Sequence, residues 1–209
     1  MKNLLLYVNG ILIYNNTIMR NKDIEIELKF EINKDKIDLF NKKLQSIGFV
    51  LSKRVYELSV MYDNPSQIMQ TTDGRIRLRK SGEKTILTYK KPISRKGIKK
   101  EIEYEVEVSD FNTTEKILKM MEFTKTTSYE RYRTYFHKNH IEVMIDEFPY
   151  GTFVEIEGEE KHIVTLSKDL GFDMGDNLTD SCDTIYTKRC IEKGIESSIN
   201  ILFNKCNLP

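Results

Sequence analysis

Apolar and charged residues alternate strictly between Asp23 and Ile32, with isoleucine, leucine or phenylalanine at every second position. The positions between them include Glu25, Glu27 and Lys29. Because a strand turns alternate side chains to opposite faces, this period of two predicts a strand with one apolar and one charged face. Successive side chains on one face lie roughly 6.5–7 Å apart, so the two carboxylates and the ammonium group would form one row.

Similar alternation in later segments predicts further strands. They are expected over residues 49–63, 75–80, 84–91, 100–108, 129–137, 141–146 and 152–158. Together with the first strand, this makes about eight strands, joined mostly by hairpins, and favours a mostly antiparallel α+β fold. A closed barrel of eight strands is just wide enough to hold one ligand.

Apolar residues three and four positions apart predict helices between some of these strands. Helices are expected over residues 34–47, 112–121 and 162–170, a short helix or turn over 66–72, and a helical stretch over 185–203. Asn33 or Asp35 would cap the first helix. Asn112 would cap the second, with Glu115 completing a capping box. A basic loop is expected over residues 92–97.

The first 22 residues precede this pattern and are expected to form an N-terminal extension. Two short apolar segments, 4–8 and 11–14, flank Asn9-Gly10, a dipeptide that favours a two-residue hairpin turn. The segment resembles the apolar part of a signal peptide, but no small-residue cleavage site follows, so the hairpin is preferred. No run reaches the ~20 apolar residues of a transmembrane helix, so no membrane partner is expected.

Charge and cysteine content narrow the functional classes. The chain has 33 basic and 32 acidic residues among 209, a net charge of +1. This balance suggests neither a nucleic-acid partner nor a membrane-surface helix. The 3 cysteines form no CxxC pair, which fits reduced thiols and a cytoplasmic location.

The charged faces of the expected strands carry two sets of residues. The acidic set is Glu25, Glu27, Glu103, Glu105, Asp146, Glu155 and Glu157, and the basic set is Lys29, Arg77, Arg79, Lys90, Arg131 and Arg133. Turned outward, these faces would form a solvated surface with weak ion pairs. Turned inward, they would place about a dozen charges in one cavity, an arrangement so costly without a ligand that it would indicate function.

An inward arrangement would suit a phosphate chain bound together with a divalent cation. Arginine recognises phosphate with two parallel hydrogen bonds, and lysine adds positive charge. Carboxylates beside a phosphate would repel it unless Mg²⁺ or Mn²⁺ lay between them. The sequence has no Walker A motif, so a P-loop enzyme is excluded.

The order of these residues resembles the CYTH superfamily, the triphosphate tunnel metalloenzymes. Glu25-x-Glu27-x-Lys29 resembles the N-terminal ExExK signature of that family. The further matching residues are, in order, Arg77-x-Arg79, Lys90, the acidic strand Glu101/Glu103/Glu105, Arg131-x-Arg133, Asp146 and Glu155-x-Glu157. One ExExK motif is weak evidence, but the ordered series is specific.

The resemblance implies an α+β fold with an eight-stranded antiparallel β-barrel, the triphosphate tunnel, and flanking helices. Residues 23–190 would form this domain, residues 1–22 the extension and residues 191–209 a helical tail. The implied metal ligands for Mg²⁺ or Mn²⁺ are Glu25, Glu27, Glu155 and Glu157, with Glu103 and Asp146 as supporting or second-metal carboxylates. The implied phosphate-binding residues are Arg77, Arg79, Lys90, Arg131 and Arg133.

Lys29 would lie beside the reacting phosphate, where it either orients the phosphate or assists proton transfer. The chain departs from the family pattern at two positions. Arg131 stands where lysine is usual, and Cys182 replaces a usual tyrosine. The first change keeps the charge but alters the geometry.

The resemblance leaves two reactions open. In class IV adenylate cyclases the ribose 3′-hydroxyl of ATP attacks the α-phosphorus and releases pyrophosphate. In triphosphatases water attacks a terminal phosphorus of inorganic tripolyphosphate, thiamine triphosphate or a nucleoside triphosphate. The run Thr88-Tyr89-Lys90-Lys91-Pro92 looks most like the cyclase branch. A non-catalytic polyphosphate or nucleotide-binding module is a third alternative, which would gain nothing from clustered carboxylates. The expected partner is a small-molecule triphosphate. The sequence leaves open whether the protein forms a homodimer.

Overall fold

The computed structural model describes residues 5–8, 11–14, 17–19, 23–206 and 208. Three short strands near the N-terminus form a separate antiparallel sheet, in the order β1 (Leu5–Val8), β2 (Ile11–Tyr14) and β3 (Thr17–Met19). The pairing of β1 with β2 confirms the two strands of the predicted hairpin. The Asn9-Gly10 turn itself lies outside the described residues.

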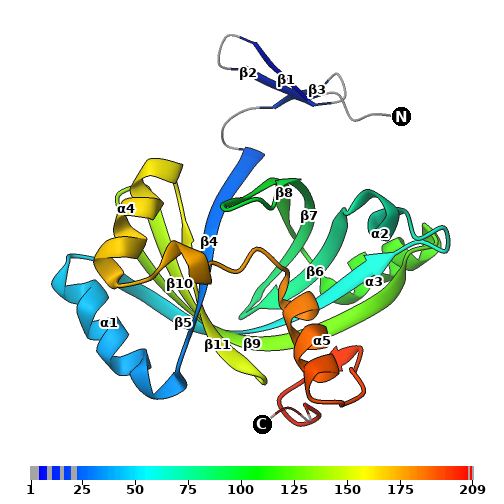
Figure 1. The fold of residues 1–209 in the computed structure, drawn as a ribbon. Coiled ribbons are helices and arrows are strands. Elements are labelled where there is room, and N and C mark those ends of the chain that lie inside the picture. The colour runs from blue at the N-terminus through cyan, green and yellow to red at the C-terminus, as the bar shows by residue number, and fades with distance from the viewer. Residues whose placement is uncertain (1–4, 9–10, 15–16, 20–22, 207, 209) are drawn as a thin grey trace.

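Eight further strands form a closed antiparallel barrel, as predicted (Figure 1). They are β4 (Ile24–Ile32), β5 (Val50–Asp63), β6 (Arg75–Ser81), β7 (Lys84–Ser94), β8 (Lys99–Val108), β9 (Thr124–Lys138), β10 (Ile141–Phe148) and β11 (Gly151–Glu157). Their order is β10-β11-β4-β8-β7-β6-β5-β9, and the pairing of β9 with β10 closes the ring.

Helices connect the strands and cover the outside of the barrel (Figure 1). They are α1 (Ile37–Ser46), α2 (Ile68–Thr72), α3 (Phe111–Met120), α4 (Glu160–Leu170) and α5 (Cys182–Glu192), with 3₁₀ turns at Lys34–Lys36 and Met174–Asp176. Within the described residues, no helix is long and apolar enough to cross a membrane.

Two of the apolar clusters lie on the outside of the barrel wall. Leu28 and Phe30 of β4 pack with residues of α1 and α4 such as Leu44 and Ile163. A second apolar cluster packs α3 on the outer faces of β5 and β6. Because side chains alternate along each strand, this outward apolar face turns the charged face of the same strand into the barrel.

The structure corrects three local expectations. Asp110, rather than Asn112, caps α3, because its side chain accepts a hydrogen bond from Thr113 N at 2.7 Å. Neither Asn33 nor Lys36, the residues before the first 3₁₀ turn and α1, makes a side-chain cap hydrogen bond. Strand β7 continues through Pro92, where its pairing with β8 shifts register, as proline in a strand requires an edge or a bulge.

The expected helical stretch over residues 185–203 is confirmed as far as Glu192 and wrong beyond it. Helix α5 ends at Glu192, and Gly194 follows with a φ of 65°, a left-handed conformation that ends helices. The chain then forms a two-residue strand, β12 (Asn200–Ile201), that pairs in parallel with β9. The last residues therefore extend the sheet instead of forming a helical tail.

Candidate active site inside the barrel

The barrel encloses a cavity of about 200 Å³ whose lining is mainly charged. Strand β4 supplies Glu25, Glu27 and Lys29 to this cavity, and its apolar residues face outward. The other lining residues that the sequence singled out are Arg77, Arg79, Lys90, Glu103, Glu105, Arg131, Arg133, Glu155 and Glu157. The charged faces of the strands therefore point inward and share one cavity.

Three carboxylates form a compact group at one part of the cavity. In the described part of the chain, oxygens of Glu25, Glu27 and Glu157 lie within 4.8 Å of one another. Burial and the charge of Glu25 raise the pKa of Glu157 well above its ordinary value. Carboxylates held this close repel one another, so a hard divalent cation with oxygen ligands fits the group. We call these three residues the acidic group.

Glu155 lies near the acidic group but is bound by two cations. Its Oε1 lies 3.0 Å from Lys29 Nζ, and its Oε2 accepts a hydrogen bond from Arg133. Lys29 Nζ is also 3.2 Å from Glu27 Oε1. Burial disfavours the charged ammonium group, but Glu27 and Glu155 outweigh it and raise the pKa of Lys29. Lys29 is therefore a permanently charged link between Glu27 and Glu155.

Asp146 does not lie at a position from which it could bind a metal ion in the cavity. It does not line the cavity and is fully buried. Its oxygens accept hydrogen bonds from Arg131 at 2.7 Å and from Arg133 at 2.6 Å. With both oxygens used by arginines, Asp146 orients these two side chains and does not face a ligand.

Lys90 lies at the acidic group, although the resemblance implied that it binds phosphate. Its Nζ is 2.5 Å from Glu25 Oε2 and 3.1 Å from Glu103 Oε1. Arg77 lies 3.7 Å from the same Glu103 carboxylate. Glu103 is thus paired with cations on two sides, which makes it less suited to hold a second metal ion than expected.

Arg77, Arg79 and Arg131 form the positively charged part of the cavity. Arg79 is only 6% exposed, and its ion pair with Glu57 is long, at 3.6 Å. Burial and the nearby charges of Arg77 and Arg131 lower the pKa of Arg79. Among the described residues, the Nε atoms of Arg77 and Arg79 have no hydrogen-bond partner. Buried guanidinium groups with unused donors fit an anionic ligand such as a phosphate chain.

Sequence reasoning missed Glu57, the carboxylate that holds this arginine group in place. Glu57 is fully buried and accepts hydrogen bonds from Arg131 Nε and Ser81 Oγ, both at 2.8 Å, and from Tyr135 at 3.0 Å. Burial opposes its ionisation, but Arg131 and Arg79 hold the pKa of Glu57 far below its ordinary value. The available signal was a charged residue at an inward position of the strand expected over residues 49–63.

Lys99 and Glu101 also belong to the cavity, together with Arg75. Glu101 was noted as part of the acidic strand, and Arg75 shares the face of Arg77, but neither was assigned a role. Lys99 was missed because the strand was expected to begin one residue later. Its position has the same parity as Glu101, which was the signal that would have found it.

A larger chamber of about 1360 Å³ adjoins the cavity. The two spaces share Glu25, Glu103, Glu105, Glu142 and Glu157, so the acidic group lies at their junction. The outer chamber is also lined by Ile24, Ile26, Ile93, Tyr104, His137 and His140. Apolar and aromatic groups beside polar ones are typical of sites for organic ligands.

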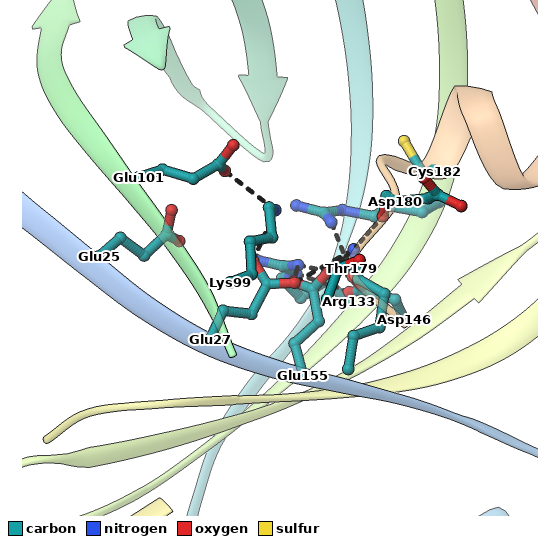
Figure 2. A network of polar contacts seen from close by, with 12 residues as sticks. Glu25, Glu27, Lys99, Glu101, Arg133, Asp146, Glu155, Thr179, Asp180 and Cys182 are labelled. Carbon is teal, nitrogen blue, oxygen red and sulfur yellow. Dashed lines mark hydrogen bonds and ion pairs between the residues drawn. The ribbon is translucent and has the colours of Figure 1, made fainter. Parts of the chain in front are cut away.

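The other end of the cavity is covered by the segment that leads into α5. Ser181, Cys182 and Asp183, at the start of this helix, line the cavity wall. Apolar residues of α5 pack on Tyr129 and Phe153 from the strands below. Figure 2 shows Cys182 and Asp180 of this segment on the same side of the site as Arg133. Arg77 and Arg131 interact with Tyr129, on which α5 packs, so these arginines lie toward the covered end, and the shared carboxylates border the outer chamber.

The CYTH domain model matches residues 23–171 of this chain. The match covers the strands and inward residues that build the cavity. The chain belongs to the CYTH family. The matched region ends at Gly171, before the segment that covers the cavity, and it begins after the three-stranded N-terminal sheet.

Similar proteins carry adenylate cyclase names. A "putative adenylate cyclase" from Methanocaldococcus jannaschii is 28% identical over 136 residues, 64% of this chain and 76% of that protein. A structure of a "putative adenylate cyclase" from Vibrio parahaemolyticus has a TM-score of 0.69 at 16% identity, covering 78% of this chain and 97% of that one. A Hippeastrum protein, described as a "putative adenylyl cyclase" with a dominant triphosphatase activity, has a TM-score of 0.55 at 16% identity, covering 84% and 98%. The two structures show the shared barrel fold.

Proposed function

We propose that this protein is a divalent-metal-dependent enzyme that converts a triphosphate bound inside the barrel. The best-supported reaction is that of a class IV adenylate cyclase, in which ATP gives cyclic AMP and pyrophosphate. The observation that carries this proposal is the order of charges along the cavity. Arginines with unused donors lie at the covered end, and the acidic group lies where the cavity meets the outer chamber.

This order suggests how a nucleoside triphosphate would lie. Its terminal phosphates would bind Arg77, Arg79 and Arg131, because these side chains offer buried cationic donors. Its organic group would occupy the outer chamber, which has the volume and the apolar lining that the cavity lacks. The α-phosphoryl group would then be the one nearest the acidic group, and attack on the α-phosphorus is the cyclase reaction.

Glu25, Glu27 and Glu157 are the residues that would hold Mg²⁺ or Mn²⁺. Such an ion would neutralise phosphoryl oxygens next to these carboxylates and stabilise the charge that develops on them. Lys29 would act as a fixed cation beside the reacting group, because its raised pKa makes it a poor proton acceptor at neutral pH. Of the two roles open to Lys29, the structure therefore favours orientation of the phosphate.

Triphosphate hydrolysis is the alternative, and one observation favours it. The arginine part of the cavity binds phosphate groups regardless of what they are attached to, so tripolyphosphate or thiamine triphosphate would fit the same residues. The Hippeastrum protein with this fold is itself described by a dominant triphosphatase activity. A polyphosphate-binding module without catalysis is less favoured, because the acidic group would only repel its ligand.

The deciding experiment separates the products formed from three substrates. Purified protein would be incubated with ATP, thiamine triphosphate or tripolyphosphate, each with Mg²⁺ or Mn²⁺. We expect cyclic AMP and pyrophosphate from ATP. Orthophosphate from any substrate, without cyclic AMP, would replace the cyclase reaction with hydrolysis.

Variants of the acidic group test whether the product comes from this site. Glu27→Ala and Glu157→Ala should each abolish metal-dependent turnover and leave the barrel folded, as judged by circular dichroism. Full activity of either variant would contradict its metal role. No product from any substrate in a folded wild-type protein would favour the binding module.

A further inference from the structure

Lys99 is a buried cation for which the proposed reaction has no role. It is 4% exposed, and its Nζ lies 3.0 Å from Glu27 Oε2 and 2.9 Å from Glu101 Oε2. Lys99 pairs directly with Glu27 across β4 and β8, so the backbone register holds the two side chains together. Figure 2 shows Lys99 reaching from its strand between Glu27 and Glu101.

Two ammonium groups lie beside the Glu27 carboxylate. Lys99 Nζ donates a hydrogen bond to Oε2 at 3.0 Å, whereas Lys29 Nζ is 3.2 Å from Oε1, which has no hydrogen-bond partner among the described residues. A divalent cation that binds Glu27 through Oε2 would therefore compete with Lys99 for that oxygen. Lys29 is anchored elsewhere as well, by Glu155 at 3.0 Å and by the carbonyl oxygen of Asp180 at 3.4 Å.

Lys99 has a second partner that allows it to leave Glu27. Glu101 is 1% exposed, and Lys99 already contacts its Oε2 while Arg75 binds its Oε1. Both charges would stay paired in the interior if Lys99 moved entirely onto Glu101. Lys90 stands in a similar relation to Glu25, but its second partner, Glu103, has a side chain that is 22% exposed, whereas that of Glu101 is 1% exposed.

Without a bound cation, the acidic group needs positive charge from the protein. Carboxylates buried beside one another are costly unless a counter-charge is close. Lys99 supplies that charge to Glu27, the most buried member of the group at 3% exposure. The same contact makes Lys99 a competitor of the metal ion for Glu27.

We propose that Lys99 is an internal counter-cation of the metal site. It neutralises Glu27 when no divalent cation is bound and shifts onto Glu101 when one binds. The inference rests on the proposed metal role of Glu27. If so, Lys99 stabilises the metal-free barrel and weakens metal binding. The barrel can then fold before the divalent cation binds.

The test compares Lys99→Met with wild type in the absence of substrate. Thermal unfolding would be followed in EDTA and over a Mn²⁺ titration. The Mn²⁺ affinity would be obtained from the concentration of free Mn²⁺, measured by electron paramagnetic resonance. We expect Lys99→Met to unfold at a lower temperature in EDTA and to regain the wild-type value at saturating Mn²⁺. We expect its Mn²⁺ affinity to rise about tenfold, because a competing buried ion pair has been removed.

Lys84→Met is the matched control for the loss of a lysine. Lys84 lies on the neighbouring strand β7, and its ion pair with Glu107 is exposed to solvent. This variant should match wild type in Mn²⁺ affinity and in both unfolding temperatures. An effect of Lys84→Met equal to that of Lys99→Met would mean that net charge, and not the contact with Glu27, sets the affinity.

Glu101→Gln provides a second test that does not depend on the folding of Lys99→Met. It leaves Glu27 as the remaining carboxylate for Lys99, so Mn²⁺ should bind more weakly than to wild type. Two results would overturn the proposal: Lys99→Met that is equally destabilised with and without Mn²⁺, or unchanged Mn²⁺ affinity in both variants. Wild-type protein that binds no Mn²⁺ would instead refute the metal site itself, and the counter-cation with it.

Discussion

At the scale of single residues, the charged barrel interior is stable because almost every charge is paired with an opposite one. Glu57 is the clearest case, since one buried carboxylate contacts Arg79 and Arg131 at once. Burial of several guanidinium groups side by side would otherwise be prohibitive. Glu57 therefore prepares the arginines for a phosphate chain without filling the space that the phosphates would use.

Glu57→Gln should destabilise the protein at neutral pH. Loss of a buried ion pair costs about 3–5 kcal/mol, which lowers the melting temperature by about 10 °C for a chain of this size. The folded pKa of Glu57 is depressed, so its stabilisation is present above the ordinary carboxyl range and is lost as the pH falls toward the folded pKa.

The pH dependence of unfolding separates this effect from a simple packing defect. The difference in melting temperature between wild type and Glu57→Gln should shrink as the pH falls below the ordinary carboxyl pKa of about 4.3. Differential scanning calorimetry from pH 7 to pH 3 measures it. A difference that stays constant over this range would show that the charge of Glu57 contributes nothing.

Arg79→Ala should weaken substrate binding more than it slows the chemical step. Arg79 is buried in the arginine part of the cavity, and its Nε has no partner among the described residues. A hydrogen bond to a charged group is worth about 1.5–3 kcal/mol, so KM should rise about 10- to 100-fold. Steady-state kinetics measure this, with the exposed neighbour Lys80→Ala as control. Unchanged KM and kcat would count against a phosphate role.

At the scale of elements, a segment after α4 replaces a missing strand neighbour. Strand β8 pairs with β4 only as far as Glu27, so the next residues of β4 lack β8 as a partner on that edge. There Asn177 accepts a hydrogen bond from Lys29 N at 2.8 Å, and Leu178 N donates to Lys29 O at 2.8 Å. Asn177 also donates to the carbonyl oxygen of Gly97, just before β8 begins.

Asn177→Ala should lower kcat and leave KM nearly unchanged. The change removes both side-chain hydrogen bonds that hold Lys29 and the start of β8 in place, and a small displacement of an orienting group costs about 10- to 100-fold in rate. Asn177→Asp should recover part of the loss, because its carboxylate still accepts from Lys29 N. Asn112→Ala, at an exposed position of α3, is the control. Equal loss in both alanine variants would show that Asn177 does not position Lys29.

At the scale of the whole molecule, the segment after α5 packs against α5 and the barrel. Ile201 and Leu208 are buried against residues of α5 and of the barrel, and Phe203 N donates to Glu130 of β9. The expected domain limit at residue 190 would remove these contacts. The N-terminal strands β1 to β3, in contrast, pair only with one another among the described residues.

Truncation should therefore destabilise the protein at the C-terminal end and have no effect on stability at the N-terminal end. A chain that stops at residue 190 should lose about 3–6 kcal/mol, from two buried aliphatic side chains at about 1.5–3 kcal/mol each. Its melting temperature should fall by about 10 °C or more. A chain that begins at Asp23 should keep the wild-type melting temperature and the activity. Equal melting temperatures for both truncations would restore the earlier domain limit.

The sequence by itself determined the faces of the strands and, through them, the fold class. Alternation along β4, β8 and β11 assigns each charged residue to one side, because the period of a strand is two whatever its surroundings. The closed barrel with an inward charged face was implied by the resemblance of the ordered charged motifs to the CYTH superfamily. Most of the charged lining of the cavity was therefore predictable. Arg75, Lys99, Glu142 and Asp183 were not assigned to it, and Asp146 does not line it.

Only the tertiary structure decided which charges meet. Asp146 and Glu155 have the residue type and parity of metal ligands, yet arginines and Lys29 bind them. The register of β9 and β10 places Arg133 beside Asp146, and the register of β4 and β11 places Lys29 beside Glu155. The register of β4 against β8 likewise brings Lys99 to Glu27. Register and closure depend on the turns and on the whole sheet, so the alternation within one strand does not fix them by itself.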